Sequence, residues 1–357
     1  MSTSTLAEPI TLAAPAAFGW QESESVSVII PCYNEEKFIG KALANLVGQY
    51  PADYFEIVVV DGMSDDGTRA VITEFQQTHP DIALTIIDNP ARTIPRGLNL
   101  GIAAARGGII ARVDAHAAPS AGYIRRCVAV LNDPRAAVVG MPCRVRPSAE
   151  TSMARAIAVA VSHRFGIGDA KYRLDLAPGF AEPEEVDTVA FACFRKSLWL
   201  SLGGFNEELL TNEDYDFNYR VQQRGDRVVL DRSEHCDYFA RATLSSLVRQ
   251  YLRYGFWKAQ MLKQQPRSLK LRHTVAPAFV LSIIFLAALG FFSPFALYGL
   301  AFLLVIHALA GFGFAFTSEK YGRSARMIAL LPLVFFTIHI SWGASFLVGL
   351  VHPSPRG

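Results

Sequence analysis

VSVIIPCYNEE at residues 26–36 is an apolar run that ends in a polar turn, and it indicates the fold of this chain. The pattern returns at residues 55–68, where FEIVVVD is followed by GMSDDGT. Between the two runs lies a stretch of helical composition, and this alternation is typical of βαβ units with a parallel sheet. The sequence therefore predicts an α/β fold with a mostly parallel sheet.

The alternation continues through residues 26–240, which we assign to one α/β domain. We expect strands at residues 26–31, 55–61, 83–88, 108–114, 136–140, 186–194 and 227–230, and helices at residues 36–48, 66–78, 95–106, 122–131, 196–202 and 214–223. Residues 148–183 are less regular. The first 25 residues are rich in Ala, Ser, Thr and Pro, have no basic start and are interrupted by proline, so they predict a mobile tail rather than a secretion signal.

The C-terminal third differs in composition from the rest of the 357 residues. Residues 241–274 carry eight Lys or Arg and no acid among interleaved apolar residues. This composition is typical of a basic amphipathic helix on an anionic membrane surface, and the alternative is a solvated helix of a globular domain. The apolar stretches 275–292, 295–317 and 327–351 are each near or above the about 18–20 residues that cross a bilayer, so we expect three transmembrane helices.

Charge asymmetry gives an orientation to these predicted spans. The connection at residues 318–326 carries Lys320, Arg323 and Arg326, whereas the first connection is uncharged. The positive-inside rule then predicts a multi-pass protein of the cytoplasmic (inner) membrane with its α/β domain in the cytoplasm and its C-terminus outside. The five scattered cysteines, with no C-x-x-C pair, suit buried, reduced thiols in the same compartment.

Carboxylates recur where predicted strands end. Asp61 closes one strand and Asp114 another, and an acidic run with Glu213, Asp214 and Asp216 begins a predicted helix. Open α/β sheets bind their ligands at the carboxyl ends of the strands. A carboxylate is also favoured at a helix N-terminus. This arrangement indicates an enzyme.

The ordered motifs of the chain resemble those of the family-2 inverting glycosyltransferases. The motifs are PCYNEE at 31–36, DGMSDDGT at 61–68, NLG at 99–101, DAH at 114–116, NED at 212–214 and QYLRY at 250–254. Each motif is weak alone, but the ordered set covers about two-thirds of the chain. The DAHA form and the three C-terminal spans look most like the succinoglycan-type exopolysaccharide glucosyltransferases. The resemblance implies a GT-A nucleotide-sugar-binding domain.

The resemblance also implies residues for the donor. Pro31, Tyr33 and Glu35 would hold the uridine of a UDP-sugar, and Asp61 would accept a hydrogen bond from the uracil ring. Apart from the resemblance, Arg96 lies at the start of a predicted helix and could reach phosphate, with a structural role as the alternative. The alternative for Asp61 is a capping or turn role before a helix.

A divalent metal, Mn²⁺ or Mg²⁺, is the implied cofactor, with Asp114 and His116 as its candidate ligands. The family usually has Asp-x-Asp where this chain has His116. Imidazole suits Mn²⁺ better than Mg²⁺, which prefers oxygen. The alternatives for His116 are a contact to phosphate or a surface histidine.

For the acceptor side, Asp214 resembles the general base, and Glu213 and Asp216 would orient the acceptor; the alternative is that all three cap a helix. The QYLRY motif resembles the Gln-x-x-Arg-Trp motif of membrane polysaccharide synthases. Gln250 and Arg253 would clamp the donor diphosphate and Tyr254 would form a wall of the acceptor site, unless they belong to a plain amphipathic helix.

These residues predict a membrane-anchored inverting glycosyltransferase that moves one sugar, with glucose expected, from a UDP-sugar to a polyprenyl-diphosphate-linked saccharide in surface polysaccharide synthesis. A basic loop is a further candidate for contact with the acceptor pyrophosphate, with a structural role as the alternative; its residues are His163, Arg164, Lys171 and Arg173. The expected partners are the donor, the lipid-linked acceptor and membrane lipids, with no nucleic acid. The alternatives are a polyprenyl-phosphate glycosyltransferase, a processive synthase and an inactive membrane scaffold.

Overall fold

The structure, a computed structural model, describes residues 25–174, 182–317 and 325–353. These residues form two compact units: the first contains residues 25–143, 182–207 and 213–237, and the second contains residues 144–174, 208–212, 238–317 and 325–353. The predicted mobile tail, except Ser25, and the basic residues Lys320 and Arg323 lie outside the described residues.

The described part of the first unit is built on an eight-stranded sheet of order β3-β2-β1-β4-β9-β6-β10-β8. The strands are β1 (Val26–Cys32), β2 (Phe55–Asp61), β3 (Ala83–Asp88), β4 (Ile109–Arg112), β6 (Ala136–Gly140), β8 (Glu184–Glu185), β9 (Cys193–Arg195) and β10 (Arg227–Leu230). Strands β3, β2, β1 and β4 are parallel neighbours, whereas β9 runs antiparallel to both β4 and β6. The predicted α/β fold with a mostly parallel sheet is confirmed.

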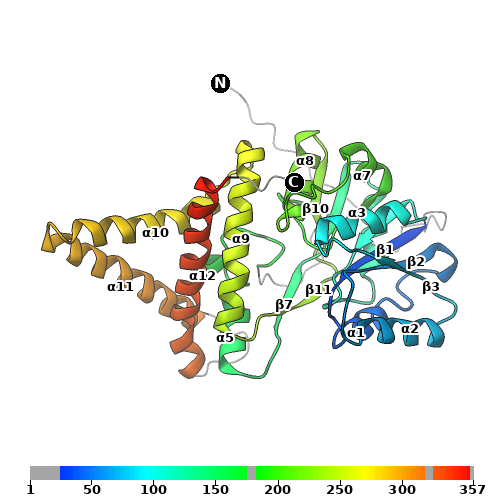
Figure 1. Ribbon diagram of the computed structural model, residues 1–357, viewed down its shortest axis with the longest axis horizontal. Helices are drawn as coiled ribbons and strands as arrows, with labels where there is room; N and C mark the ends of the chain where they lie inside the picture. The colour runs from blue at the N-terminus through cyan, green and yellow to red at the C-terminus, as the bar shows by residue number, and fades with distance from the viewer. Residues whose placement is uncertain (1–24, 175–181, 318–324, 354–357) are drawn as a thin grey trace. The chain divides into compact units, whose positions relative to one another are not determined.

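The sheet register sets the place of the candidate site. Cys32 pairs with Asp61, and Asp61 pairs with Asp88, so β1, β2 and β3 end at the same level. The helices of this unit are α1 (Ile39–Ala44), α2 (Thr68–Thr78), α3 (Ile94–Ala104), α4 (Tyr123–Leu131), α7 (Lys196–Leu202) and α8 (Glu213–Gln223), with a 3₁₀ turn η2 at Ala52–Tyr54 (Figure 1). A Cβ on Gly101 would lie 2.7 Å from Ile29, so only glycine lets α3 pack this closely on the sheet.

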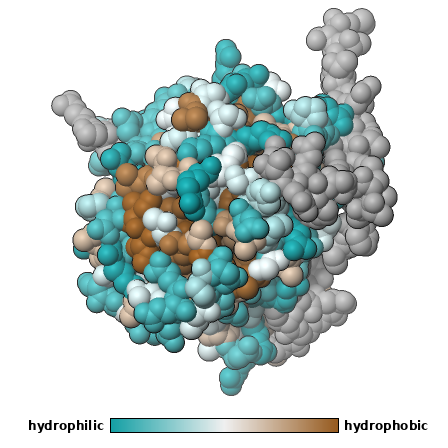
Figure 2. All heavy atoms as spheres, turned by 90° about the vertical axis from the view of Figure 1, so that its right-hand side faces the viewer, coloured by the Kyte–Doolittle hydropathy of each residue, from teal (hydrophilic) through white to brown (hydrophobic). Residues whose placement is uncertain are grey.

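The core of this unit lies between the sheet and its helices. Ile29, Ile57 and Leu98 are fully buried there. On the face seen in Figure 2, apolar residues gather at the centre and hydrophilic residues surround them. All five cysteines are buried thiols, as predicted.

Two predictions about the chain after residue 147 were wrong in detail. Of the strand predicted at residues 186–194, the structure has only Cys193–Arg195. Phe191 has φ +50°, which is not an extended conformation, and the Val189 carbonyl accepts a hydrogen bond from the Asn218 amide at 3.1 Å instead of from a neighbouring strand. The irregular segment 148–183 contains helix α5 (Ser152–Ala160). Its N-cap Thr151 accepts from the Ala154 N–H at 3.1 Å.

The second unit is mostly helical. Its elements are α5, α6 (Arg164–Ile167), α9 (Leu244–Gln264), η3 (Pro266–Ser268), α10 (Arg272–Leu289), α11 (Pro294–Thr317) and α12 (Ala325–Val351). Within the described residues α10, α11 and α12 are long and apolar enough to cross a membrane, which confirms the three predicted apolar helices. The remaining strands, which the sequence did not predict, are β5 (Ala117–Pro119) in the first unit and β7 (Cys143–Pro147) and β11 (Cys236–Ala240), whose residues are divided between the two units.

Candidate active site

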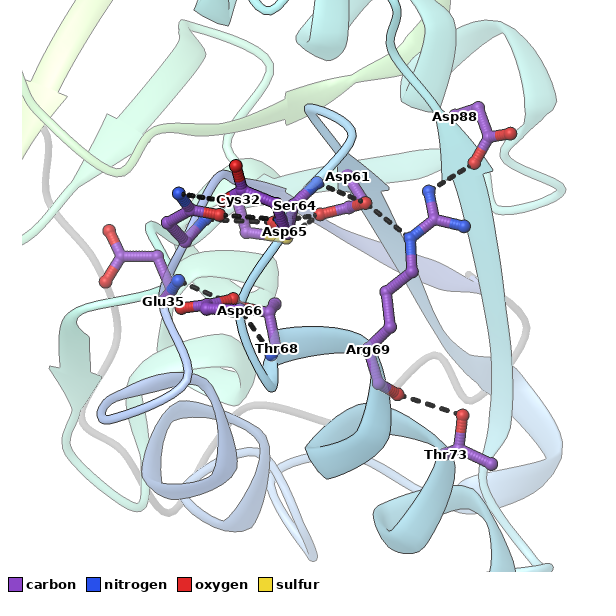
Figure 3. Close-up of polar contacts among 11 residues, drawn as sticks. Cys32, Glu35, Asp61, Ser64, Asp65, Asp66, Thr68, Arg69, Thr73 and Asp88 are labelled. Carbon is purple, nitrogen blue, oxygen red and sulfur yellow. Dashed lines mark hydrogen bonds and ion pairs between the residues drawn. The ribbon is translucent and has the colours of Figure 1, made fainter.

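The loops that follow β1 and β2 are held together by hydrogen bonds between their polar residues (Figure 3). The Asn34 backbone N–H donates to Ser64 Oγ at 2.9 Å, and its amide donates to Asp65 Oδ1 at 2.7 Å. The Glu35 N–H donates to Thr68 Oγ1 at 2.8 Å, at the start of α2. This network fixes the edge of the sheet where the predicted nucleotide residues lie, and it gives Asp65 a structural role.

Asp61 is fully buried beneath this loop, and its carboxylate already has partners. Ser64 donates to it through both N–H and Oγ, at 3.1 and 2.5 Å, and Arg69 Nε donates at 2.6 Å. Burial alone would raise the pKa of Asp61, but these hydrogen bonds and the Arg69 charge lower it below its usual range. The contacts fit the turn-and-cap alternative for Asp61, while its contact with uracil stays a prediction.

The predicted uridine residues Tyr33 and Glu35 lie in the loop after β1, and Pro31 lies in β1 itself. Tyr33 is 42% exposed, and the guanidinium of Arg92 lies 5.2 Å from the centre of its ring. Such an exposed ring beside a cation is available for stacking on a base. The Glu35 carboxylate lies 3.1 Å from His116 Nδ1, which connects this loop with the DAH motif.

The buried Arg112 joins two predicted site residues, although it was not itself predicted from the sequence. Arg112 Nε donates to Asp114 Oδ1 at 3.1 Å, and its Nη1 donates to Glu213 Oε1 at 2.9 Å. Only 10% of the Arg112 side chain is exposed. Burial would lower its pKa, but Asp114, Glu213 and Asp214 raise it, so the cation is held firmly. The available signal was an arginine in the otherwise apolar strand before Asp114.

The acidic run opens helix α8, as predicted. Asp214 is partly exposed, and its Oδ1 accepts the Tyr215 N–H at 2.7 Å. Glu213 is buried, and that burial, with the nearby Asp214 charge, raises its pKa above the usual range despite Arg112. Of the carboxylates that begin α8, Asp214 is therefore the accessible one.

Asp216 and Arg96, two other predicted site residues, have partners that suggest structural roles. Asp216 is 1% exposed and accepts from Arg220 Nε at 2.8 Å, and Arg220 in turn donates to the Leu202 carbonyl. Arg96 donates to both carboxylate oxygens of Glu207, each at 3.2 Å. Contacts of Asp216 with the acceptor and of Arg96 with phosphate stay predictions.

The QYLRY motif lies on α9 in the second unit. Gln250 is 7% exposed and its Nε2 donates to the hydroxyls of Tyr238 and Tyr254, at 3.0 and 3.1 Å. Arg253 is exposed on the same helix. In this unit the amide of Asn212, the residue before Glu213, donates to the Tyr254 carbonyl at 3.3 Å. The assignment of Gln250 and Arg253 to the donor diphosphate stays a prediction.

The donor set around Asp114 fits a divalent ion of the Mn²⁺ type. Asp114 supplies a carboxylate and His116 an imidazole, two residues apart. The described residues contain no cluster of three or more His, Cys, Asp or Glu side chains with metal-binding geometry. Asp114 and His116 are the residues that would hold such an ion, which would supply positive charge beside the donor phosphates.

The chain is similar to known proteins in sequence and in fold. Residues 27–197 match the family Glycosyl transferase family 2. The mannosyltransferase PcManGT from Pyrobaculum calidifontis, solved with GDP-Man and Mn²⁺, aligns over 94% of this chain and 91% of its own with a TM-score of 0.59 and 23% identity. At that identity the likeness shows the fold alone. The α/β unit is thus a glycosyltransferase domain of the GT-A type.

Residues 27–197 form a domain of glycosyltransferase family 2. The chain is 26% identical to the succinoglycan biosynthesis protein ExoA of Rhizobium meliloti, over 91% of this chain and 94% of that protein. It is 27% identical to a dolichyl N-acetyl-α-D-glucosaminyl phosphate 3-β-D-2,3-diacetamido-2,3-dideoxy-β-D-glucuronosyltransferase of Methanococcus voltae, over 67% of this chain and 74% of that protein. The predicted resemblance to succinoglycan-type enzymes is confirmed, and the chain is a membrane-associated glycosyltransferase.

Proposed function

We propose that this protein transfers one sugar, with inversion, from a UDP-sugar to a polyprenyl-diphosphate-linked saccharide at the cytoplasmic face of the inner membrane. The observation that carries the proposal is the buried Arg112, which joins the donor-side carboxylate Asp114 to Glu213 at the start of α8. Asp214, the next residue, is the accessible carboxylate of that helix. In this proposal the Arg112 cation sets the spacing between Asp114, on the side of the sugar donor, and the base Asp214.

In the proposed step, an acceptor hydroxyl oxygen attacks the anomeric carbon of the donor sugar. The bond from that carbon to the UDP oxygen breaks, and Asp214 takes the hydroxyl proton as the new glycosidic bond forms. A bound divalent ion would supply positive charge for the departing diphosphate. Asp114 and His116 would hold that ion, and the exposed ring of Tyr33 would stack on the base.

The acceptor and the sugar are inferred from the relatives. One relative acts in succinoglycan biosynthesis, and the other is named for a dolichyl-phosphate-linked substrate. Both fit an acceptor saccharide carried on a polyprenyl lipid. Glucose is proposed because the DAHA motif resembles the succinoglycan-type glucosyltransferases. The alternative function has polyprenyl phosphate as its acceptor. Unlike the proposed acceptor, polyprenyl phosphate has a single phosphate and carries no saccharide.

The test is a donor and acceptor panel with the full chain in detergent. UDP-glucose, other UDP-sugars and GDP-mannose are each offered with Mn²⁺ or Mg²⁺ to polyprenyl-diphosphate saccharides and to polyprenyl phosphate, and release of the nucleoside diphosphate is measured. We expect turnover with a UDP-sugar and the diphosphate-linked saccharide, and none after chelation of the metal. Turnover only with GDP-mannose, or only with polyprenyl phosphate, would replace the proposed donor or acceptor.

A further inference from the structure

A cage of tyrosine rings encloses an arginine in the second unit. The guanidinium carbon of Arg173 lies 5.0 Å from the ring centre of Tyr238 and 5.9 Å from that of Tyr254. Gln250 fixes both rings, because its Nε2 donates to both hydroxyls. The cage therefore consists of residues from three segments: the basic loop before residue 175, strand β11 and helix α9.

Two buried polar atoms of this cage lack a hydrogen-bond partner among the described residues. They are Arg173 Nε and Tyr251 Oη, and the Tyr251 side chain belongs to a residue that is 4% exposed. The largest electrostatic influences on the Arg173 charge, apart from burial, come from tyrosines. Cation–π contacts offset only part of the cost of burying a guanidinium, and a buried cation calls for a counter-charge.

We infer that this cage binds the phosphate group of the lipid-linked acceptor. Arg173 Nε and the Tyr251 hydroxyl are the donors, and a phosphate matches them because its charged oxygens accept several hydrogen bonds at once. A lipid phosphate is favoured over the donor diphosphate because the cage belongs to the unit that also contains the membrane-type helices. The identity of the acceptor rests on the proposed function. Gln250 becomes a positioning residue for the tyrosines.

The test measures binding of polyprenyl phosphate to the full chain in detergent by thermal shift, with polyprenol and inorganic phosphate as separate arms. We expect the lipid phosphate to raise the unfolding temperature and the other two to leave it unchanged. Arg173→Met should weaken this binding about 10- to 100-fold, as for a lost charged hydrogen bond. Tyr251→Phe, which keeps the packing, should weaken it about threefold to tenfold.

Arg249→Met is the matched control, since it removes an exposed arginine from α9 and should bind like the wild type. Wild-type affinity in both cage variants would overturn the inference, and so would a loss of UDP-sugar binding in place of lipid binding. If the wild type binds the lipid phosphate through Arg173 but transfers no sugar, the proposed function fails while the cage assignment holds.

A second inference comes from the helix packing of the same unit. Helices α9 and α12 lie side by side (Figure 1). A Cβ on Gly255 of α9 would lie 2.2 Å from the Trp342 carbonyl oxygen, and Gln260 donates to the Gly349 carbonyl at 3.0 Å. Because residue numbers rise together along both helices, they run parallel, and α9 flanks the C-terminal half of α12.

This pairing bears on whether α12 crosses the bilayer. Its partner α9 carries four Lys or Arg and no acid, a composition that favours a membrane surface over the hydrocarbon. Because α12 packs against α9 and runs parallel to it, α12 would also lie along that membrane surface. The sequence expectation of three crossings counted α12 by its length and composition alone.

Helices α10 and α11 differ from α12 because they project from it as a hairpin. Gly343 of α12 packs against Ala276 near the start of α10, and Pro332 packs against Gly311 in the second half of α11. His307 of α11 also lies 2.9 Å from His339 of α12. Toward its tip the hairpin is exposed and apolar, for example at Phe285 (65%) and Phe291 (90%). Such a surface needs lipid around it.

We propose that the chain enters the bilayer only as the α10–α11 hairpin, while α9 and α12 lie along the cytoplasmic face. The C-terminus is then on the same side as the α/β unit. Green fluorescent protein and alkaline phosphatase, fused in turn after residue 357, test this, with fusions after residue 270 as the cytoplasmic reference. We expect fluorescence and no phosphatase activity at both positions. Phosphatase activity at the C-terminal fusion would restore three crossings.

Discussion

Asp214→Asn is expected to lower kcat about 10²- to 10⁴-fold, the range of a lost general base. The amide cannot take the proton of the attacking hydroxyl. It does keep an oxygen that can accept the Tyr215 N–H, which Asp214 Oδ1 accepts at 2.7 Å, so the start of α8 should be preserved. The measurement is nucleoside diphosphate release under single-turnover conditions, with the unfolding temperature as the check on folding.

The Asp214→Asn result has a specific signature. KM for the donor should change little, because Asp214 acts on the acceptor proton. Asp214→Glu is the matched variant, since it keeps the base on a longer side chain and should retain more activity than the asparagine variant. Wild-type turnover in Asp214→Asn would remove Asp214 from the mechanism and leave Glu213 as the remaining carboxylate of that pair.

Arg112→Met is expected to have the second large effect, on both stability and catalysis. The substitution leaves Glu213, which is 4% exposed, and Asp114 without their shared cation. Breaking a buried ion pair on one side costs about 3–5 kcal/mol, because the remaining charge is uncompensated. Urea unfolding of the full chain in detergent should show a loss of this order, and kcat/KM should fall because Asp114 and α8 lose their common anchor.

A second substitution separates the two effects of Arg112→Met. Adding Glu213→Gln removes the uncompensated carboxylate, so stability should recover substantially in the double variant while kcat/KM stays low. Arg112→Lys keeps the charge but lacks the planar fork that reaches two carboxylates, and it should be intermediate. If Arg112→Met has normal kcat/KM, the cation does not position the site. If the double variant regains full activity, Arg112 matters only for stability.

Much of the fold could be predicted from periodicity. The strands at residues 55–61, 83–88, 136–140 and 227–230 and the helix at 196–202 have the predicted bounds. The errors fall where tertiary contacts override local pattern. Phe191 adopts a left-handed φ that no composition signal indicates, and β9 enters the sheet antiparallel between β4 and β6.

The α/β alternation, the carboxylates at the strand ends and the apolar helices are predictable from the sequence, because they depend on residue type and spacing along the chain. Which of the carboxylates are accessible depends on the packing of the folded chain. Asp61 and Asp216 are buried in hydrogen-bond networks, whereas Asp214 is partly exposed. Arg112 meets Glu213 across 101 residues, and the tyrosine cage around Arg173 joins three segments. Burial and long-range pairing arise only when distant segments pack. A sequence motif therefore indicates a functional residue but not the residue that it contacts.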